Sequence, residues 1–264
     1  APGPRYWQNR ADYKIAVTLD EAANTIAGEV EITYTNNSPE ALPFVWLQLD
    51  QNAFNDNSRS GKTTPLNGGR YGNMGFEGGY TISSVSIQQG KGKYTPADFI
   101  IDDTRMQIRL SDAVKPNGDG LKIKVGYSFK IPTYASDRMG KLDTKNGTIY
   151  EIAQWYPRMC VFDDIEGWNV LPYIGAGEFY LNYGDYEYSV TVPWDHIVGG
   201  SGELLNPSDV MTSEQIKRME EARKSDKTVM IRSAKEIKEK KSRPKDSGMI
   251  TWKFRCQNAR DVAR

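Results

Sequence analysis

The chain is poor in the residues that metal binding and nucleophilic catalysis usually require. Its 264 residues include only 2 cysteines and 1 histidine. An HExxH zinc motif needs two histidines one helical turn apart, and a Ser-His-Asp or Cys-His arrangement would also have to use His196. No serine lies in a Gly-x-Ser-x-Gly motif. The sequence therefore predicts no metal site in this chain, and we interpret His196, in "PWDHIVGG", as a surface or turn residue.

Net charge and long apolar runs are also missing. The 34 basic and 34 acidic residues cancel, so no overall field favours nucleic acid or another polyanion as a partner. No apolar run approaches the ~20 residues that cross a bilayer, so we expect no transmembrane segment. The start, "APGPRYWQ", has no initiator methionine and is typical of the flank left by a removed signal peptide, which predicts an exported, periplasmic or cell-surface protein.

The two cysteines, Cys160 and Cys256, lie far apart, and no other cysteine or histidine stands near either at a zinc-ligand spacing. The sequence favours two buried thiols and leaves a disulfide open.

Aromatic residues (11%), 24 glycines and 13 prolines are typical of strands and turns rather than a helical bundle. Apolar side chains alternate with polar ones along 12–20, 25–35 and 121–129, and residues 44–50 are apolar on both faces. Further alternating runs occupy 80–87, 105–110, 185–194 and 249–254. These patterns predict an all-β fold of twisted, mostly antiparallel sheets, arranged as a sandwich or saddle.

Two segments interrupt the strand pattern. Residues 51–80 contain seven glycines without a P-loop or GxGxxG motif, so we expect a functional or disordered loop that does not bind phosphate. Residues 207–246 contain a capping-box signal at Thr212 and Gln215, and Ser233 and Glu236 repeat it. We interpret 207–246 as a charged helical insertion on the solvated surface, with a partner-binding patch as the alternative.

Acidic and aromatic residues concentrate in "FDDIEGW", where Asp163, Asp164 and Glu166 precede Trp168. Paired carboxylates beside an aromatic ring occur in glycosidases, but the same residues can cap a turn or pair with Arg158. An alternating stripe also has two interpretations, as a sugar-stacking face or as a core strand. It consists of Tyr186, Tyr188, Val190, Val192 and Trp194.

Four segments, in order, resemble the N-terminal β-domain of bacterial zinc aminopeptidases of the aminopeptidase N (gluzincin) type. They are "ADYKIAVTLDEAANTIAGEVEITYTNNSPEALPFVWLQLDQNAF", "AQWYPRMCVFDDIEGW", "VGGSGELLNP" and "TWKFRCQNARDVAR". The resemblance runs from Tyr6 to Arg264, except for the Gly-rich loop and the charged insertion. The HExxH helix and the GxMEN-type loop of that family do not occur in this chain.

The resemblance implies that residues 1–264 form a single N-terminal domain, with 251–264 leading into a catalytic domain absent from this chain. Zinc is expected in that domain, and the implied partners are the protein's own C-terminal catalytic domain and a peptide substrate. Gln154 and Arg158 match the substrate-binding positions, where Gln154 would accept hydrogen bonds from the free α-amine of the substrate.

The same resemblance places a domain interface at Trp155, Tyr156, Asp163, Asp164 and Trp168. In the isolated chain these residues should form an exposed aromatic patch. Two alternatives remain: a stand-alone β-sandwich that binds carbohydrate or protein at the cell surface, and a glycosidase that uses Asp163, Asp164 or Glu166.

Overall fold

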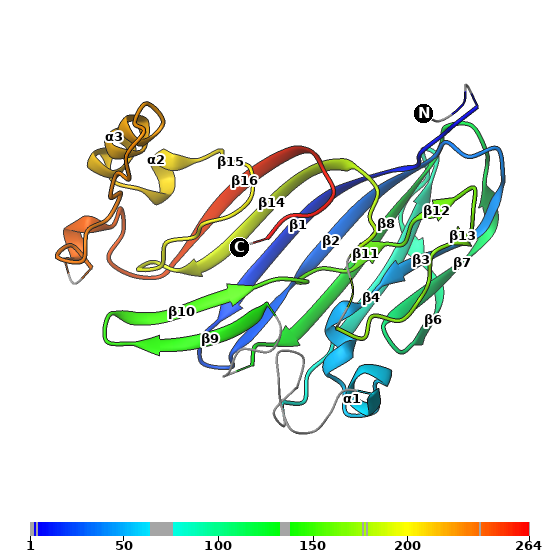
Figure 1. Cartoon of the computed structure of the whole chain (residues 1–264), viewed down its shortest axis with the longest axis horizontal. Coiled ribbons are helices and arrows are strands. Elements are labelled where there is room, and N and C mark those ends of the chain that lie inside the picture. The colour runs from blue at the N-terminus through cyan, green and yellow to red at the C-terminus, as the bar shows by residue number, and fades with distance from the viewer. Residues whose placement is uncertain are drawn as a thin grey trace.

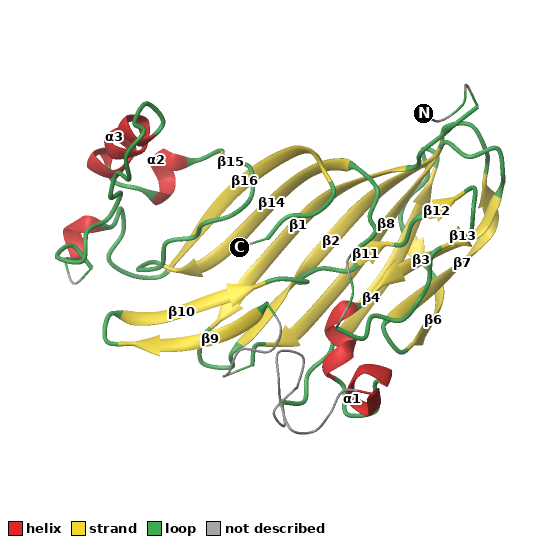
Figure 2. Cartoon of the chain, viewed as in Figure 1, coloured by secondary structure: helices red, strands yellow, loops and turns green. Residues whose placement is uncertain are grey.

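The computed structural model describes residues 3, 5–63, 76–132, 138–175, 177, 179–237 and 239–263. Two main sheets and two hairpins make up most of it, with few helices (Figures 1 and 2). The predicted all-β class, with mostly antiparallel sheets and a short helical insertion, is confirmed. Residues 64–75 of the predicted Gly-rich loop lie outside the described part of the chain.

The large sheet has eight strands in the order β15-β16-β14-β1-β2-β8-β4-β5. Their bounds are β1 (Arg10–Asp20), β2 (Thr25–Asn36), β4 (Thr81–Gln89), β5 (Thr95–Pro96), β8 (Asp119–Lys130), β14 (Gly184–Pro193), β15 (Glu203–Leu204) and β16 (Met249–Ala259). Neighbouring strands are antiparallel except β1 and β14, which run parallel in register from Tyr13↔Tyr186 to Thr18↔Thr191. This pairing brings chain segments far apart in sequence to the centre of one sheet.

Burial follows the predicted alternation because one face of each long strand packs on the core. In β1 the inward set is Tyr13, Ile15, Val17 and Leu19, and in β8 it is Leu121, Ile123, Val125, Tyr127 and Phe129. In β14, Tyr186 and Tyr188 are also buried, at 1% and 3% exposure. The core alternative for that aromatic stripe is therefore confirmed, and these two rings do not form a sugar-stacking face.

The second sheet has the order β11-β3-β7-β6 and packs on the same core. Its strands are β3 (Leu42–Gln48), β6 (Asp98–Asp102), β7 (Arg105–Val114) and β11 (Arg158–Met159). Val45 and Leu47 of β3 are fully buried, whereas Phe44 and Trp46 on its other face are half-buried. Although residues 44–50 are apolar on both faces, the strand is therefore fully covered on one face only.

Two hairpins extend from the sheets. The first consists of β9 (Met139–Thr144) and β10 (Gly147–Ile152), and the second of β12 (Phe162–Asp163) and β13 (Gly167–Trp168). In Figure 1 the β9–β10 hairpin projects beyond the central strands on the side of the helical insertion.

Ordered structure begins earlier in the Gly-rich segment than the sequence suggests. A 3₁₀ turn, η1 (Asp50–Phe54), directly follows β3, and all five of its residues are buried. A short helix, α1 (Arg59–Thr63), comes next. The expectation of a loop from residue 51 is wrong for η1, because its polar side chains find buried partners that no local pattern reveals.

The charged insertion contains α2 (Pro207–Val210), α3 (Ser213–Ala222) and η2 (Lys240–Ser242). The capping box predicted at Thr212 and Gln215 is present in both directions. At the second signal, Ser233 donates to Glu236 through both its amide and its hydroxyl, yet only a turn follows at 234–237. The segment lacks an apolar face to bury, and a helical turn without such packing is marginal.

The Glu236 carboxylate gives the insertion an acid-sensitive contact. Hydrogen bonds from Ser233, and then the Arg218 guanidinium at 2.9 Å, lower the pKa of Glu236 from 4.5 to about 2. Because the folded pKa is depressed, this contact stabilises the segment above pH 4.5 and loses its effect as the pH falls toward 2. We expect the NMR titration of the Glu236 carboxyl to show this low midpoint. Arg218→Gln should raise the midpoint and Arg223→Gln should not; an unchanged midpoint in Arg218→Gln would contradict the assignment.

Candidate functional site

Arg158 lies at the centre of a buried polar cluster. Its side chain is fully buried in β11, and it donates through Nη1 to Asp261 Oδ2 at 2.8 Å and through Nη2 to Asp50 Oδ2. The Phe179 ring lies 4.1 Å from the guanidinium carbon, and Tyr156 donates to the other oxygen of Asp261 at 2.6 Å. The cluster therefore joins η1, β11 and the C-terminal segment 260–263.

The charges in this cluster are coupled. Burial alone would lower the pKa of Arg158, but Asp50 and Asp261 together raise it, so the guanidinium stays protonated. Burial raises the pKa of Asp50, and the attraction of Arg158 offsets only part of that effect. Both Nη atoms of Arg158 bind carboxylates, so its contacts orient the segment. A direct contact between Arg158 and substrate remains a prediction.

Gln154, the other predicted substrate-binding residue, has an unusual backbone and an unused acceptor. Its φ of 54° is in the left-handed region, which costs a non-glycine residue on the order of 1–3 kcal/mol. Gln51 Nε2 (3.0 Å) and Tyr80 OH (2.9 Å) both donate to its carbonyl oxygen and hold this geometry. The Gln154 side chain donates from Nε2 to Tyr173 OH at 2.7 Å. Its Oε1 is buried without a hydrogen-bond partner in the described part of the chain.

The predicted exposed aromatic patch is wrong for Trp155 and Tyr156, because both are fully buried. The Trp155 indole donates to the carbonyl of Val262 at 2.9 Å, and its ring packs edge-on against Tyr188. Tyr156 packs edge-on against Tyr13 and Tyr186 in the same way. The large sheet and the C-terminal segment bury these rings within this chain, so neither ring is available to contact another domain.

Asp163 serves the turn between β12 and β13. It accepts hydrogen bonds from the amides of Ile165 (3.1 Å) and Glu166 (2.9 Å) and from the Asn169 side chain (2.9 Å). Partial burial alone would raise the pKa of Asp163, but these bonds together lower it. The turn-capping alternative is thus confirmed for Asp163, while Asp164 is exposed and Trp168 is half-buried against Phe162. An interface role for these three residues remains a prediction.

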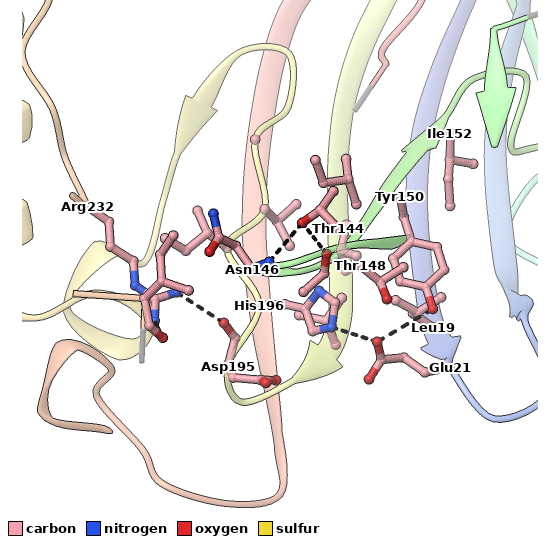
Figure 3. Close-up of a pocket in the computed structure, with 18 of the residues that line it drawn as sticks. Leu19, Glu21, Thr144, Asn146, Thr148, Tyr150, Ile152, Asp195, His196 and Arg232 are labelled. Atoms are coloured by element: carbon pink, nitrogen blue, oxygen red, sulfur yellow. Dashed lines mark hydrogen bonds and ion pairs between the residues drawn. The ribbon is translucent and has the colours of Figure 1, made fainter. Parts of the chain in front are cut away.

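A cavity of about 750 Å³ lies between the large sheet, the β9–β10 hairpin and the 195–199 loop (Figure 3). Leu19, Ile26, Val190 and Val192 line its apolar side. His196 Nε2 lies 2.9 Å from Glu21 Oε1, and Tyr150 OH donates to the same oxygen at 3.5 Å. Burial, followed by the nearby Glu21 charge, raises the pKa of Tyr150 to about 12.

Sequence reasoning missed this cavity. His196 does occupy a turn, as predicted, since its amide donates to the Pro193 carbonyl at 3.1 Å. Its partner Glu21 is 175 positions away in the sequence, so no local motif connects them. The free thiols also differ from each other: Cys160 is buried, as expected, but Cys256 is only half-buried.

Metal binding and membrane crossing find no support in the described ranges. No group of three or more His, Cys, Asp or Glu side chains there could hold a metal ion. His196 has Glu21 as its acidic partner, which does not make a zinc ligand set. No described helix is long and apolar enough to cross a bilayer.

Comparisons with known proteins found similarity only among solved structures. No protein-family model and no curated protein matches the chain. Solved structures that resemble it include an M1 zinc metallopeptidase from Deinococcus radiodurans (13% identity, TM-score 0.42) and a mutant of that organism's enzyme bound to a Tyr-Ser-Ala substrate (12%, 0.44). A third is a two-domain M1 zinc metallopeptidase mutant bound to L-tryptophan (12%, 0.45). Each alignment covers 94% of this chain but only 39% of the other.

Replacing Arg158 tests whether the buried cluster holds the fold together. Arg158→Met leaves Asp50 buried without its counter-charge, which should lower the free energy of unfolding by about 3–5 kcal/mol. Asp261→Asn, at a side chain that is 37% exposed, should cost about 1 kcal/mol. Urea denaturation measures both. Adding Asp50→Asn to Arg158→Met should recover part of the loss, and no recovery would show that packing rather than charge is responsible.

Proposed function

We propose that this chain is the non-catalytic N-terminal β-domain of a zinc aminopeptidase. It would cover one side of the active-site cleft and help to position the free amino end of a peptide substrate. The catalytic zinc and the glutamate that activates its water would belong to a C-terminal catalytic domain, the proposed partner of this chain. By this proposal, the chain alone does not hydrolyse peptides.

The unpartnered Oε1 of Gln154 is the observation that carries this proposal. An ammonium group has only donors and needs acceptor oxygens, and a buried amide oxygen interacts with it more strongly than one in bulk water. The rest of Gln154 is already fixed by hydrogen bonds. Its side-chain Nε2 donates to Tyr173 OH, and its backbone carbonyl accepts from Gln51 and Tyr80. Such an oxygen is preorganised to accept a hydrogen bond from a substrate amine.

The contacts of the C-terminal segment support a link to a following domain. Arg158 binds Asp261, and Trp155 donates to the carbonyl of Val262, so two residues that follow Gln154 in the "AQWYPR" stretch bind this segment. The resemblance identifies 251–264 as the lead-in to the catalytic domain. A rigid connection of this kind would fix Gln154 relative to that domain. Export to the periplasm or cell surface remains part of the proposal.

A second candidate function is carbohydrate binding at the cell surface. Tyr6, Tyr180 and Tyr183 are each about half exposed and surround a small hollow of about 130 Å³ that Trp7 and Asp163 also line. Exposed aromatic rings beside polar groups are suited to stacking on sugar rings. Retention on a glycan resin, lost in Tyr180→Ala, would favour this function over the first.

The proposed function is tested with aminoacyl fluorogenic substrates and zinc analysis by mass spectrometry. This chain should neither cleave nor hold zinc, and the polypeptide extended beyond residue 264 should do both. Gln154→Ala in the extended protein should lower kcat/KM about 10- to 100-fold, mainly through KM, because a hydrogen bond to a charged amine is lost. An extended protein that is inert and free of metal would refute the proposal.

Two controls make the Gln154 result specific. Gln88→Ala, which removes a half-buried amide on β4, should leave kcat/KM unchanged. An amino acid inhibitor should lose affinity in Gln154→Ala, whereas the same molecule without its amino group should not. Equal losses for both inhibitors would show that Gln154 has no role in amine recognition.

A further inference from the structure

We propose that the cavity in Figure 3 is a docking groove for an extended peptide segment with alternating basic and apolar side chains. We call it the hairpin groove and define it by β10, by the apolar side chains Leu19, Ile26, Val190 and Val192, and by the 195–199 loop. None of the groove residues is assigned to amine recognition, so a test of the groove does not depend on the role of Gln154.

The backbone edge of β10 is the first element of this groove. In the hairpin, the lining residues come from Thr144, the turn and β10, whereas Met139–Asp143 of β9 are not among them. The groove therefore follows the side of β10 that faces away from β9. Every second residue of a strand directs its N–H and C=O away from the paired neighbour, and in the described structure β10 pairs with β9 alone. A free edge of this kind can accept an additional strand.

The apolar side chains supply the second element. The four floor residues are buried in the sheet, and Ile149 and Ile197 stand on the rim with 55% and 44% of their surface exposed. The volume of about 750 Å³ lies within the range of roughly 300–1,000 Å³ typical of ligand sites. A strand laid along β10 would direct alternate side chains toward this floor, which favours apolar residues at every second position.

The charges in the groove indicate which side chains a bound peptide would carry at the positions between its apolar residues. The groove contains the carboxylates of Glu21 and Asp195, whereas its cationic groups are already engaged. His196 Nε2 binds Glu21, and Arg232 donates to the Ser242 hydroxyl and to the backbone carbonyls of Asp195, Glu236 and Ile237. Glu21 Oε2 and the Asp195 carboxylate have no hydrogen-bond partner among the described residues, so these oxygens are left to face a ligand. They favour lysine or arginine over acidic side chains.

The groove is also preformed. Glu21 follows β1, Tyr150 belongs to β10, and His196 belongs to the loop after β14, so the two contacts to Glu21 Oε1 connect three walls of the groove. Figure 3 shows these three side chains meeting on one side of the cavity. Fixing the walls before binding reduces the entropy that a ligand must overcome.

Fluorescence anisotropy with this chain and two labelled hexapeptides tests the groove. The peptide of alternating lysine and valine should bind, and the peptide of alternating glutamate and valine should not. Glu21→Gln and Asp195→Asn should each weaken binding about two- to fivefold at low ionic strength, as expected for exposed charge pairs. Hydrogen exchange of the Thr148–Ile152 amides should slow when the lysine peptide binds.

A matched pair of variants separates the groove from the rest of the hairpin. Ile149 and Leu142 are cross-strand partners with similar exposure, 55% and 61%, but only Ile149 lines the cavity. Ile149→Ser should weaken binding about fivefold from lost apolar contact, and Leu142→Ser should leave it unchanged.

Four outcomes would overturn the proposal: no binding of the lysine peptide, equal binding of both peptides, equal effects of the two serine variants, or unchanged hydrogen exchange in β10. Analytical ultracentrifugation of the chain without peptide tests whether a second copy of the chain occupies the groove instead. A dimer that Ile149→Ser dissociates would assign the groove to a second copy of this chain instead.

Discussion

The ion pairs of Arg158 with Asp50 and Asp261 are the constraint on which the rest of the site depends. The three residues come from η1, β11 and the C-terminal segment, which no local structure would bring together. A buried guanidinium requires counter-charges, because removing it from water without them costs several kcal/mol. The ion pairs of Arg158 therefore fix the path of η1 and of the C-terminal segment, in which Val262 and Asp261 accept hydrogen bonds from Trp155 and Tyr156.

This constraint reaches Gln154 through the backbone. The chain passes from the β9–β10 hairpin through Gln154 and its buried neighbours to Arg158, and the left-handed residue absorbs the change of direction. Strained residues persist where the surroundings determine them, and here Gln51, Tyr80 and Tyr173 provide those surroundings. An acceptor oxygen held this firmly is suited to recognising a donor and has no means of activating water.

The hairpin groove, which lies along β10, is also held by a charge cluster, but its interactions are weaker. Its walls meet at Glu21, which is 38% exposed, so solvent screens the contacts with His196 and Tyr150. The deeply buried cluster holds the fold, whereas the half-exposed one leaves a groove open to solvent. Under our proposal, the different burial of these two charge clusters gives one a structural role and the other a binding role.

The sequence by itself determined the strands, their inward faces and the cap of α3. These features depend on neighbours within a few residues: the two-residue period of a strand selects Tyr13 to Leu19, and Thr212 needs only Gln215 three positions later. It also indicated Gln154 and Arg158, but only through the likeness of a short stretch to known enzymes. The same resemblance suggested that Trp155 and Tyr156 would be exposed, because it placed them at an interface with another domain.

Tertiary structure decided which groups are partners. The burial of Trp155, the counter-charges of Arg158 and the meeting of Glu21 with His196 each join residues more than a hundred positions apart. Such contacts depend on strand order, including the parallel pairing of β1 with β14, and no periodicity encodes that order. The sequence therefore determines which residues face inward, while the packing of distant segments determines whether a polar residue becomes a structural tie or a free binding group.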